Sequence, residues 1–232
     1  MASRPEFPVE IIFKDNMRIP LQVCSPIPSR NGTDSVRRIL EAAEALFSKQ
    51  GFDAVSVNDI SARAGVSKAN VFHHFSSKRD LYLAVLQSAS QKFGSAIDEF
   101  DGGKGSIDEN LAGFAKAHLA RILENEQLSR LILSDVLENA PQQSKDMGEK
   151  IFGDNFARLV SLIRGSQENK ALRNDIDPAM IAVLLIGANV FFFEAREVLR
   201  HFSDVAFVDK PEDFSRMLVD IMLHGILPPA GK

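Results

Sequence analysis

The sequence has few of the residues that build disulfide-linked or metal-stabilised proteins. Its 232 residues contain a single cysteine, Cys24, which excludes an internal disulfide framework and a cysteine-based zinc site. It also has no Gly-rich phosphate loop, no paired-histidine metal motif and no nucleophile beside a base that we can place. We therefore expect no catalytic residue, no bound metal and no cofactor, and an all-helical enzyme is the weaker alternative.

Long hydrophobic runs are also missing. The longest run, residues 179–193, stops at Glu194 and is shorter than the roughly 20 residues that a membrane span needs. Charged residues at positions 6, 10, 14 and 15 interrupt any signal-peptide core. Because 45% of the residues are hydrophobic and no low-complexity block occurs, we expect a folded cytoplasmic protein without a membrane partner.

Residues 34–86 carry the most specific pattern, three short helices joined by tight turns. In the first, apolar residues recur every three or four positions from Val36 to Phe47, and Gly51 stands where a left-handed C-terminal cap would sit. Ser56 can cap the second helix, which ends at a turn containing Gly65. A third helix must start immediately afterwards, so the spacing predicts a helix-turn-helix.

The third helix is the expected reader of DNA. An α-helix fits the major groove of B-DNA and offers its N-terminal side chains to base edges. Ser67 can cap this helix, and its first residues are a cation at Lys68, a small residue at Ala69 and an amide at Asn70. An asparagine amide suits bidentate pairing with adenine. Just beyond, the start of a fourth helix at Lys78 offers free N–H groups and a cation to a phosphate.

These residues resemble the DNA-binding domain of the TetR family of transcriptional regulators. Segments 37–43, 46–47, 57–61, 64–68, 74–75 and 77–78, together with Gly51, carry the resemblance. It implies an all-helical homodimer that binds a double-stranded DNA operator and represses transcription. It also implies a larger C-terminal domain that binds a small-molecule effector and then releases the operator.

Motif and resemblance together predict the residues that contact DNA. The candidates are Ser56, Ser67, Lys68, Ala69, Asn70, His73 and Lys78. Phe72 departs from the family pattern, because members commonly have a tyrosine there whose hydroxyl reaches a phosphate. The neighbouring His73 is the residue that can compensate.

The formal net charge of −4 is unevenly distributed. Residues 35–82 hold seven Lys and Arg against five Asp and Glu, whereas residues 83–232 hold sixteen against twenty-two. Attraction to phosphate needs local rather than global positive charge. The positive segment coincides with the predicted DNA-binding unit, so the acidic total does not oppose that function.

We expect three parts along the chain. Residues 1–33 contain five prolines, which exclude a long helix, and form an extended or disordered leader. The alternative is an arm that places Arg18 or Arg30 in the minor groove. Residues 34–82 form the helix-turn-helix domain, and residues 83–232 form the ligand-binding and dimerisation domain.

The C-terminal part reads as helices throughout, so the predicted fold class is all-α. We expect a fourth helix from Lys78 to about Phe100, ended by glycines 102 and 103. A later helix after Asp177 and Pro178 is apolar on nearly every side, and a last helix covers about residues 211–224. The family resemblance implies that this terminal pair forms a four-helix bundle with its twin.

Two sets of side chains in this part are candidates for binding. An apolar pocket is expected at Phe93, Phe114, His118, Phe152, Phe156, Phe191 and Phe192, although for His118 a satisfied core histidine is the plainer interpretation. The dimer interface is expected at Leu184, Leu185, Phe214, Met217, Leu218, Ile221 and Met222. The alternative function is a DNA-binding protein whose C-terminal domain only dimerises or docks a protein partner.

Overall fold

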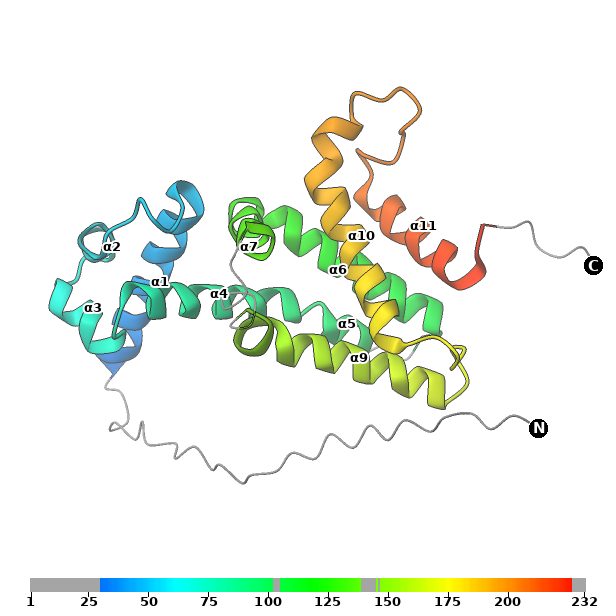
Figure 1. Ribbon diagram of the computed structural model, residues 1–232, viewed down its shortest axis with the longest axis horizontal. Helices are drawn as coiled ribbons and strands as arrows, with labels where there is room; N and C mark the ends of the chain where they lie inside the picture. The colour runs from blue at the N-terminus through cyan, green and yellow to red at the C-terminus, as the bar shows by residue number, and fades with distance from the viewer. Residues whose placement is uncertain (1–29, 102–104, 139–144, 146, 227–232) are drawn as a thin grey trace, which may run out of the picture.

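The computed structural model describes residues 30–101, 105–138, 145 and 147–226, and in this part of the chain every regular element is a helix. The predicted all-α class is therefore confirmed. The elements are α1 (Arg30–Gln50), α2 (Val57–Ala64), α3 (Lys68–His74), α4 (Lys78–Gly94), α5 (Ile97–Asp101), α6 (Ile107–Glu124), α7 (Glu126–Glu138), the π-helical η1 (Met147–Phe152), α9 (Gly153–Glu168), α10 (Pro178–Leu199) and α11 (Pro211–His224). Figure 1 shows α1, α2 and α3 gathered at one end, here called the head, with α4 leading into the body formed by the later helices.

Local hydrogen bonds hold the turn between α2 and α3. The Ser56 hydroxyl accepts from the Asp59 N–H, and the Asp59 carboxylate accepts from the Ser56 N–H, which completes a capping box at the start of α2. Gly65 ends α2 with φ of 64°, a left-handed conformation that favours glycine. Arg38 of α1 donates to the carbonyls of Ala64 and Gly65, so the first helix fixes the turn of the helix-turn-helix.

The first helix is longer than the sequence indicated. α1 begins at Arg30, so the predicted leader of residues 1–33 extends too far. Arg30 is the first residue of this helix, which removes it as a candidate for an extended minor-groove arm. Arg18 and the rest of the leader lie outside the described residues.

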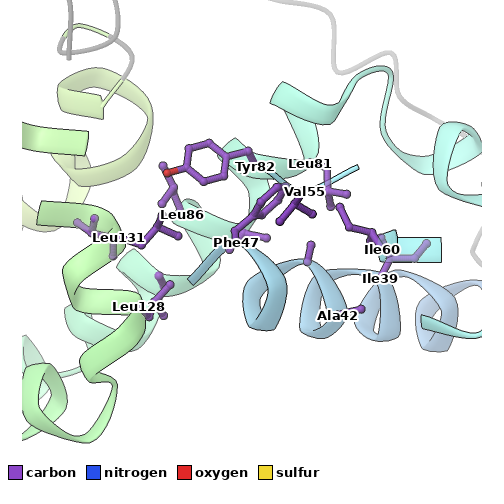
Figure 2. Close-up of a cluster of buried hydrophobic side chains, with 14 of the residues drawn as sticks. Ile39, Ala42, Phe47, Val55, Ile60, Leu81, Tyr82, Leu86, Leu128 and Leu131 are labelled. Atoms are coloured by element: carbon purple, nitrogen blue, oxygen red, sulfur yellow. The ribbon is translucent and has the colours of Figure 1, made fainter. Parts of the chain in front are cut away.

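A hydrophobic cluster joins the head to the body (Figure 2). Phe47 of α1 is fully buried, and the Tyr82 ring of α4 meets it edge-on with centroids 5.1 Å apart. Leu128 and Leu131 of α7 close the cluster from the body side. The predicted boundary between residues 82 and 83 falls inside α4, and this cluster spans it, so head and body share one core.

The fourth helix ends earlier than predicted. α4 stops at Gly94, and Phe100 lies in a separate short helix, α5. Asn155 of α9 donates its side-chain amide to the Ser90 carbonyl at 2.9 Å, and a Cβ at Gly94 would lie 2.5 Å from that amide. The Ala96 N–H turns instead to the Phe93 carbonyl three residues back, which tightens the chain and ends the helix. The glycines at 102 and 103 lie outside the described residues.

A second hydrophobic cluster builds the body around α6. Its fully or nearly fully buried members include Leu111 and Phe114 of α6, Leu159 and Ile163 of α9, and Leu185 of α10. α6 contacts α5, α10 and α11, and Figure 1 shows α10 crossing α6 with α11 beside it. Packing of apolar helix faces against α6 therefore holds the body together.

The apolar sequence of α10 suggested a helix that is buried on every side, but the structure leaves one side of it exposed. Met180, Leu184, Phe191 and Val198 of this helix are exposed, while Leu185 and Phe192 are buried. Its 22 residues are long and apolar enough to cross a membrane by length and composition alone, which corrects the expectation of a run too short to span one. Core helices of soluble proteins pass the same test, and only 28% of the apolar window is buried in this chain. The exposed side of α10 therefore needs another explanation.

Candidate nucleic-acid interface and cavity

The outward face of α3 carries most of the side chains predicted to contact DNA. Val71 is buried and anchors the helix on the head. The Ser67 hydroxyl accepts from the Asn70 N–H at 3.1 Å, which caps the helix and sets its direction. The side chains left on the exposed face are Ser67, Lys68, Ala69, Phe72 and His73.

Asn70 is placed differently from its exposed neighbours. Its side chain is half-buried, and its amide oxygen is buried without a hydrogen-bond partner. A bidentate contact with adenine uses both the amide oxygen and the amide nitrogen. Asn70 must therefore rotate its side chain before it can read a base in that way.

Three of the predicted residues, Ser56, Lys68 and Lys78, border one hollow of about 370 Å³ on the head. The Lys78 ammonium lies 4.3 Å from the centre of the Phe52 ring and donates to the Asp53 carbonyl at 3.4 Å. These contacts hold the cation at the N-terminus of α4, where Ser77 caps the helix. A helix start with a fixed cation is suited to a phosphate.

Carboxylates on the head serve as helix caps. The hydrogen bond from the Ser56 hydroxyl lowers the pKa of Asp59, and hydrogen bonds from Ser76 and Ser77 lower the pKa of Asp80. Both carboxylates therefore stay ionised at neutral pH and stabilise the first turns of α2 and α4. Among the described residues, no group of three His, Cys, Asp or Glu side chains is placed to hold a metal ion.

Phe72 is an exposed aromatic residue on the recognition face. Its ring is 45% exposed, and the Lys68 ammonium lies 6.0 Å from the ring centre. A phenylalanine has no hydroxyl, so it cannot donate to a phosphate as a tyrosine at this position would. The exposed imidazole of His73 lies next in sequence and is the available donor.

The body contains a cavity of about 530 Å³, lined almost entirely by apolar side chains. Five of the seven predicted pocket residues line it: Phe93, Phe114, His118, Phe152 and Phe156. They come from α4, α6, η1 and α9. The second hydrophobic cluster joins α6 to α9, Asn155 joins α9 to α4, and the Ser90 hydroxyl of α4 donates to the Ile151 carbonyl of η1. The volume lies within the range of small-molecule sites, about 300 to 1,000 Å³.

The other two predicted pocket residues are not among those lining this cavity. Phe191 is 66% exposed on the outside of α10. Phe192 is buried, but its ring stacks on Phe214 of α11 with centroids 4.4 Å apart and lies near Phe207. These two predictions were wrong because α10 turns its 183, 186, 187 and 190 positions to the cavity instead.

The sequence reading also missed one wall of the cavity. α7 contributes Ile132, Leu133 and Val136, and α10 contributes Val183, Ile186 and Val190. The three-and-four spacing of these residues marks a helix face, but such spacing is equally typical of core packing. Val136 and Val183 are also exposed, so they mark where the cavity reaches the surface.

His118 is the only ionisable residue among the described residues that line the cavity. Its ring stacks on Phe114, with centroids 5.6 Å apart and an interplanar angle of 13°. Its Nδ1 lies 3.1 Å from the side-chain nitrogen of Asn189, which also donates to the Ala115 carbonyl at 2.9 Å. Burial, followed by the nearby charge of Arg121, lowers the pKa of His118 from 6.5 to about 4, so the ring is neutral at pH 7.

The residues predicted for the dimer interface divide into two groups. Leu184, Met217 and Ile221 are exposed on α10 and α11. Leu185 is fully buried in the body, and Phe214, Leu218 and Met222 are partly buried. Leu185 was therefore predicted wrongly, because adjacent positions on a helix point about 100° apart and only Leu184 faces outward.

The exposed apolar residues of α10 form a regular stripe. Positions 180, 184, 187, 191, 195 and 198 are separated by steps of three or four residues and share one side of the helix. Met180, Leu184, Phe191 and Val198 are the large exposed members, and between them lie Gly187, which also borders the cavity, and the half-buried Ala195. We call these six positions the α10 stripe, and Met217 and Ile221 of α11 add a second exposed row.

Comparison with known proteins assigns this arrangement to a family. The model for bacterial regulatory proteins of the TetR family matches residues 39–85, which are the helix-turn-helix and the start of α4. The transcriptional activator FasR of Mycolicibacterium smegmatis is 30% identical over 155 residues, covering 66% of this chain and 68% of that protein. The transcriptional repressor Rv1474c of Mycobacterium tuberculosis is 26% identical over 141 residues, covering 60% of this chain and 70% of that protein.

Solved structures show the same fold over most of the chain. FadR of Bacillus subtilis, crystallised with stearoyl-CoA, aligns with a TM-score of 0.69 at 14% identity and covers 82% of this chain and 99% of its own. Sequence and fold together define a helix-turn-helix transcriptional regulator. The chain belongs to the TetR family, whose members are generally not enzymes.

Proposed function

We propose that the protein is a homodimeric repressor that binds a palindromic operator and leaves it when a small, largely apolar effector binds. The position of the cavity carries this proposal. Phe93 and Gly94 of α4 line the cavity, and the same helix begins at Lys78 beside the recognition unit. A molecule that fills the cavity therefore contacts the helix that holds the head.

The head supports direct reading of DNA by α3. Lys68 and His73 are exposed on the face away from the core, and Lys78 stands at the N-terminus of the next helix. Two heads related by a two-fold axis match an inverted repeat whose half-sites lie about 34 Å, or one helical turn, apart or a multiple of it. Binding of this kind weakens steeply with salt, because Lys and Arg displace counterions from phosphates.

The α10 stripe supports a homodimer. Large apolar patches are rare on monomeric soluble proteins, and a second copy offers the same stripe about a two-fold axis. Met217 and Ile221 of α11 extend the surface beside it. This pair of helices is the surface that we propose to be buried in the dimer, within a ligand-binding and dimerisation domain of residues 83–232.

A hydrogen bond provides a route from the cavity to the head. Ile132, Leu133 and Val136 of α7 line the cavity, and Asp135 on the same helix accepts from the Tyr82 hydroxyl at 2.6 Å. Tyr82 packs on Phe47 of the head. A ligand that displaces α7 therefore acts on the core that head and body share.

The cavity lining supports an apolar effector. Phe93, Phe114, Phe152 and Phe156 contribute aromatic surface, and the polar Ser90, Ser129 and Asn155 already hydrogen-bond within the protein. FadR of B. subtilis, which has the same fold, was crystallised with stearoyl-CoA, and this agrees with an effector that has a long apolar part.

DNA selected from a randomised pool by the full-length protein tests the DNA-binding part of the proposal. We expect an inverted repeat, and Asn70→Ala is expected to relax preference at one base position by about 1 to 3 kcal/mol. If the Asn70→Ala protein kept its selectivity, the buried amide of Asn70 would not be the group that rotates out to read a base. A reporter gene behind the selected site then gives the sign of regulation, since relatives include both a repressor and an activator.

A protein that binds DNA but gains no thermal stability from any apolar probe would leave dimerisation or partner docking as the role of the body. Binding of a ligand to the native state must raise the melting temperature. The same screen therefore separates the effector hypothesis from the docking hypothesis.

A further inference from the structure

The hydrogen bonds around Asn189 fix the proton on His118. Asn189 is fully buried, and its side-chain nitrogen is 2.9 Å from the Ala115 carbonyl and 3.1 Å from His118 Nδ1. The carbonyl can only accept, so the amide nitrogen and not the oxygen must face it. That nitrogen then also donates to Nδ1, and a neutral imidazole with an accepting Nδ1 carries its hydrogen on Nε2.

The donor on Nε2 is available to a ligand. His118 lines the cavity and Asn189 does not, so the ring edge bound to Asn189 is the one directed away from the cavity. Among the described residues, the one hydrogen bond of the His118 ring is at Nδ1. The side-chain oxygen of Asn189, Oδ1, is buried without a hydrogen-bond partner, which destabilises the fold. The chain carries this cost while the amide nitrogen holds the His118 ring.

The cavity offers nothing to neutralise an anion. None of the described residues that line it is a lysine or an arginine. The low pKa of His118, about 4, keeps the ring uncharged at pH 7. An ionised carboxylate buried there would lose its hydration without gaining a cation, which is strongly unfavourable.

We propose that the part of the effector inside the cavity is uncharged and presents one hydrogen-bond acceptor, such as a ketone, ester or thioester carbonyl, to His118 Nε2–H. This inference rests on the proposed function, namely that the cavity holds the effector. His118 is the residue that contacts the ligand, and Asn189 is a positioning residue that acts through the imidazole. The remaining surface of the cavity then packs on an apolar chain.

Three probes with eleven carbon atoms test the inference: 2-undecanone, undecanoate and undecane. Their binding is measured at pH 7 by displacement of N-phenyl-1-naphthylamine from the full-length protein. We expect 2-undecanone to bind about tenfold more tightly than undecane, the gain of one hydrogen bond in an apolar site, and more tightly than undecanoate. His118→Phe keeps an aromatic ring but removes the donor, so the ketone should lose its advantage over undecane.

His201→Phe is the matched control, because the same substitution is made at an exposed position outside the cavity lining. It should leave the preference for 2-undecanone unchanged. Nitrogen NMR of the imidazoles gives a readout that does not depend on ligand: His118 should show protonated Nε2 and unprotonated Nδ1 in the wild type. Asn189→Leu should lose that single tautomer, which a purely structural role of Asn189 would not change.

The outcomes separate the inference from the function on which it rests. Tighter binding of undecanoate, or a ketone preference that survives in His118→Phe, would overturn the neutral-acceptor inference while the cavity remained a ligand site. Failure of all three probes to displace the dye would overturn both the inference and the proposed role of the cavity.

Discussion

Removing the Tyr82 hydroxyl should weaken the connection between head and body without opening the core. Tyr82→Phe keeps the ring that packs edge-on against Phe47 at 5.1 Å and lies 4.8 Å from Phe52. It deletes only the donor to the Asp135 carboxylate, which accepts at 2.6 Å across α4 and α7. Burial and this hydrogen bond raise the pKa of Tyr82 well above its usual value, so the hydroxyl is a donor at every pH at which the protein is studied.

The expected loss of stability follows from the charge and the burial of the hydrogen-bond partner, Asp135. A hydrogen bond to a charged group contributes about 1.5 to 3 kcal/mol, but Asp135 is half-buried and water can reach it once the hydroxyl is gone. We therefore expect Tyr82→Phe to lower the free energy of unfolding by about 1 to 2 kcal/mol. If the bond also transmits ligand binding, the fold-change in operator affinity caused by a ligand should shrink towards one.

Urea unfolding in a double-mutant cycle measures the first effect. Tyr82→Phe and Asp135→Ala should couple by about 1 kcal/mol or more, because both remove the same contact. Ser134→Ala is the matched control, since its hydroxyl donates to the Leu131 carbonyl within α7 itself. A coupling free energy below about 0.5 kcal/mol would show that the Tyr82 hydroxyl and Asp135 do not stabilise the joint between head and body. An unchanged response of operator affinity to ligand would refute the proposed route.

Three further predictions concern the other sites. In a fluorescence anisotropy titration, Lys78→Ala should weaken binding to all DNA sequences alike and reduce the slope of affinity against salt by about one. Lys116→Ala on α6 is the control and should leave both unchanged. A sequence-specific effect would instead assign Lys78 to base reading. Ile221→Asp should give monomer or aggregate in sedimentation, because an unpaired charge buried in the interface costs several kcal/mol. Ala62→Asp on the exposed side of α2 is the control and should sediment as the wild type does. A wild-type protein that is monomeric at micromolar concentration would disprove the homodimer. The pKa of His118 is about 4 in the folded state and 6.5 without burial, so the unfolded chain takes up the proton first as pH falls. This group should therefore lower the free energy of unfolding by about 2 kcal/mol between pH 7.5 and pH 5. His118→Gln should flatten that part of the pH dependence in guanidinium unfolding, and an unchanged slope would mean that the ring is not held neutral.

The sequence was sufficient for the head because its structure depends on local signals. Ser56, Gly65 and Ser67 are caps and a turn residue whose effects act within a few positions, and each has the predicted role in the structure. The contact of Arg38 with the Ala64 carbonyl was not predicted, since it joins residues far apart in the sequence. The inward-facing amide oxygen of Asn70 was missed for a related reason, because one partly buried side chain on a short helix cannot be told from its exposed neighbours by periodicity alone.

In the body, periodicity indicated which residues are buried but not which surface they face. Phe191 and Phe192 were both placed in the pocket, yet neighbours on a helix point about 100° apart and a single wall cannot take both. In the structure, the Phe192 ring stacks on the Phe214 ring, and Phe191 lies on the α10 stripe. The same geometry separates Leu184 from Leu185. A sequence that is apolar on every side of α10 is thus explained by three different apolar surfaces, namely the cavity, the core and the exposed stripe.

The arrangement of these surfaces on one helix has a consequence for regulation. Val183 and Val190 of α10 line the cavity, and Leu184 and Phe191 are the next residues along the chain on the exposed stripe. Packed interiors are close to incompressible, so a ligand that moves the cavity side of α10 also moves the side on which a second copy would pack. If the stripe is the dimer interface, filling the cavity changes the angle between two subunits at the same time as it acts on α4 and α7. Under the proposed mechanism, both effects would alter the separation of the two α3 helices, and a dimer matched to a fixed half-site spacing would have little tolerance for that change.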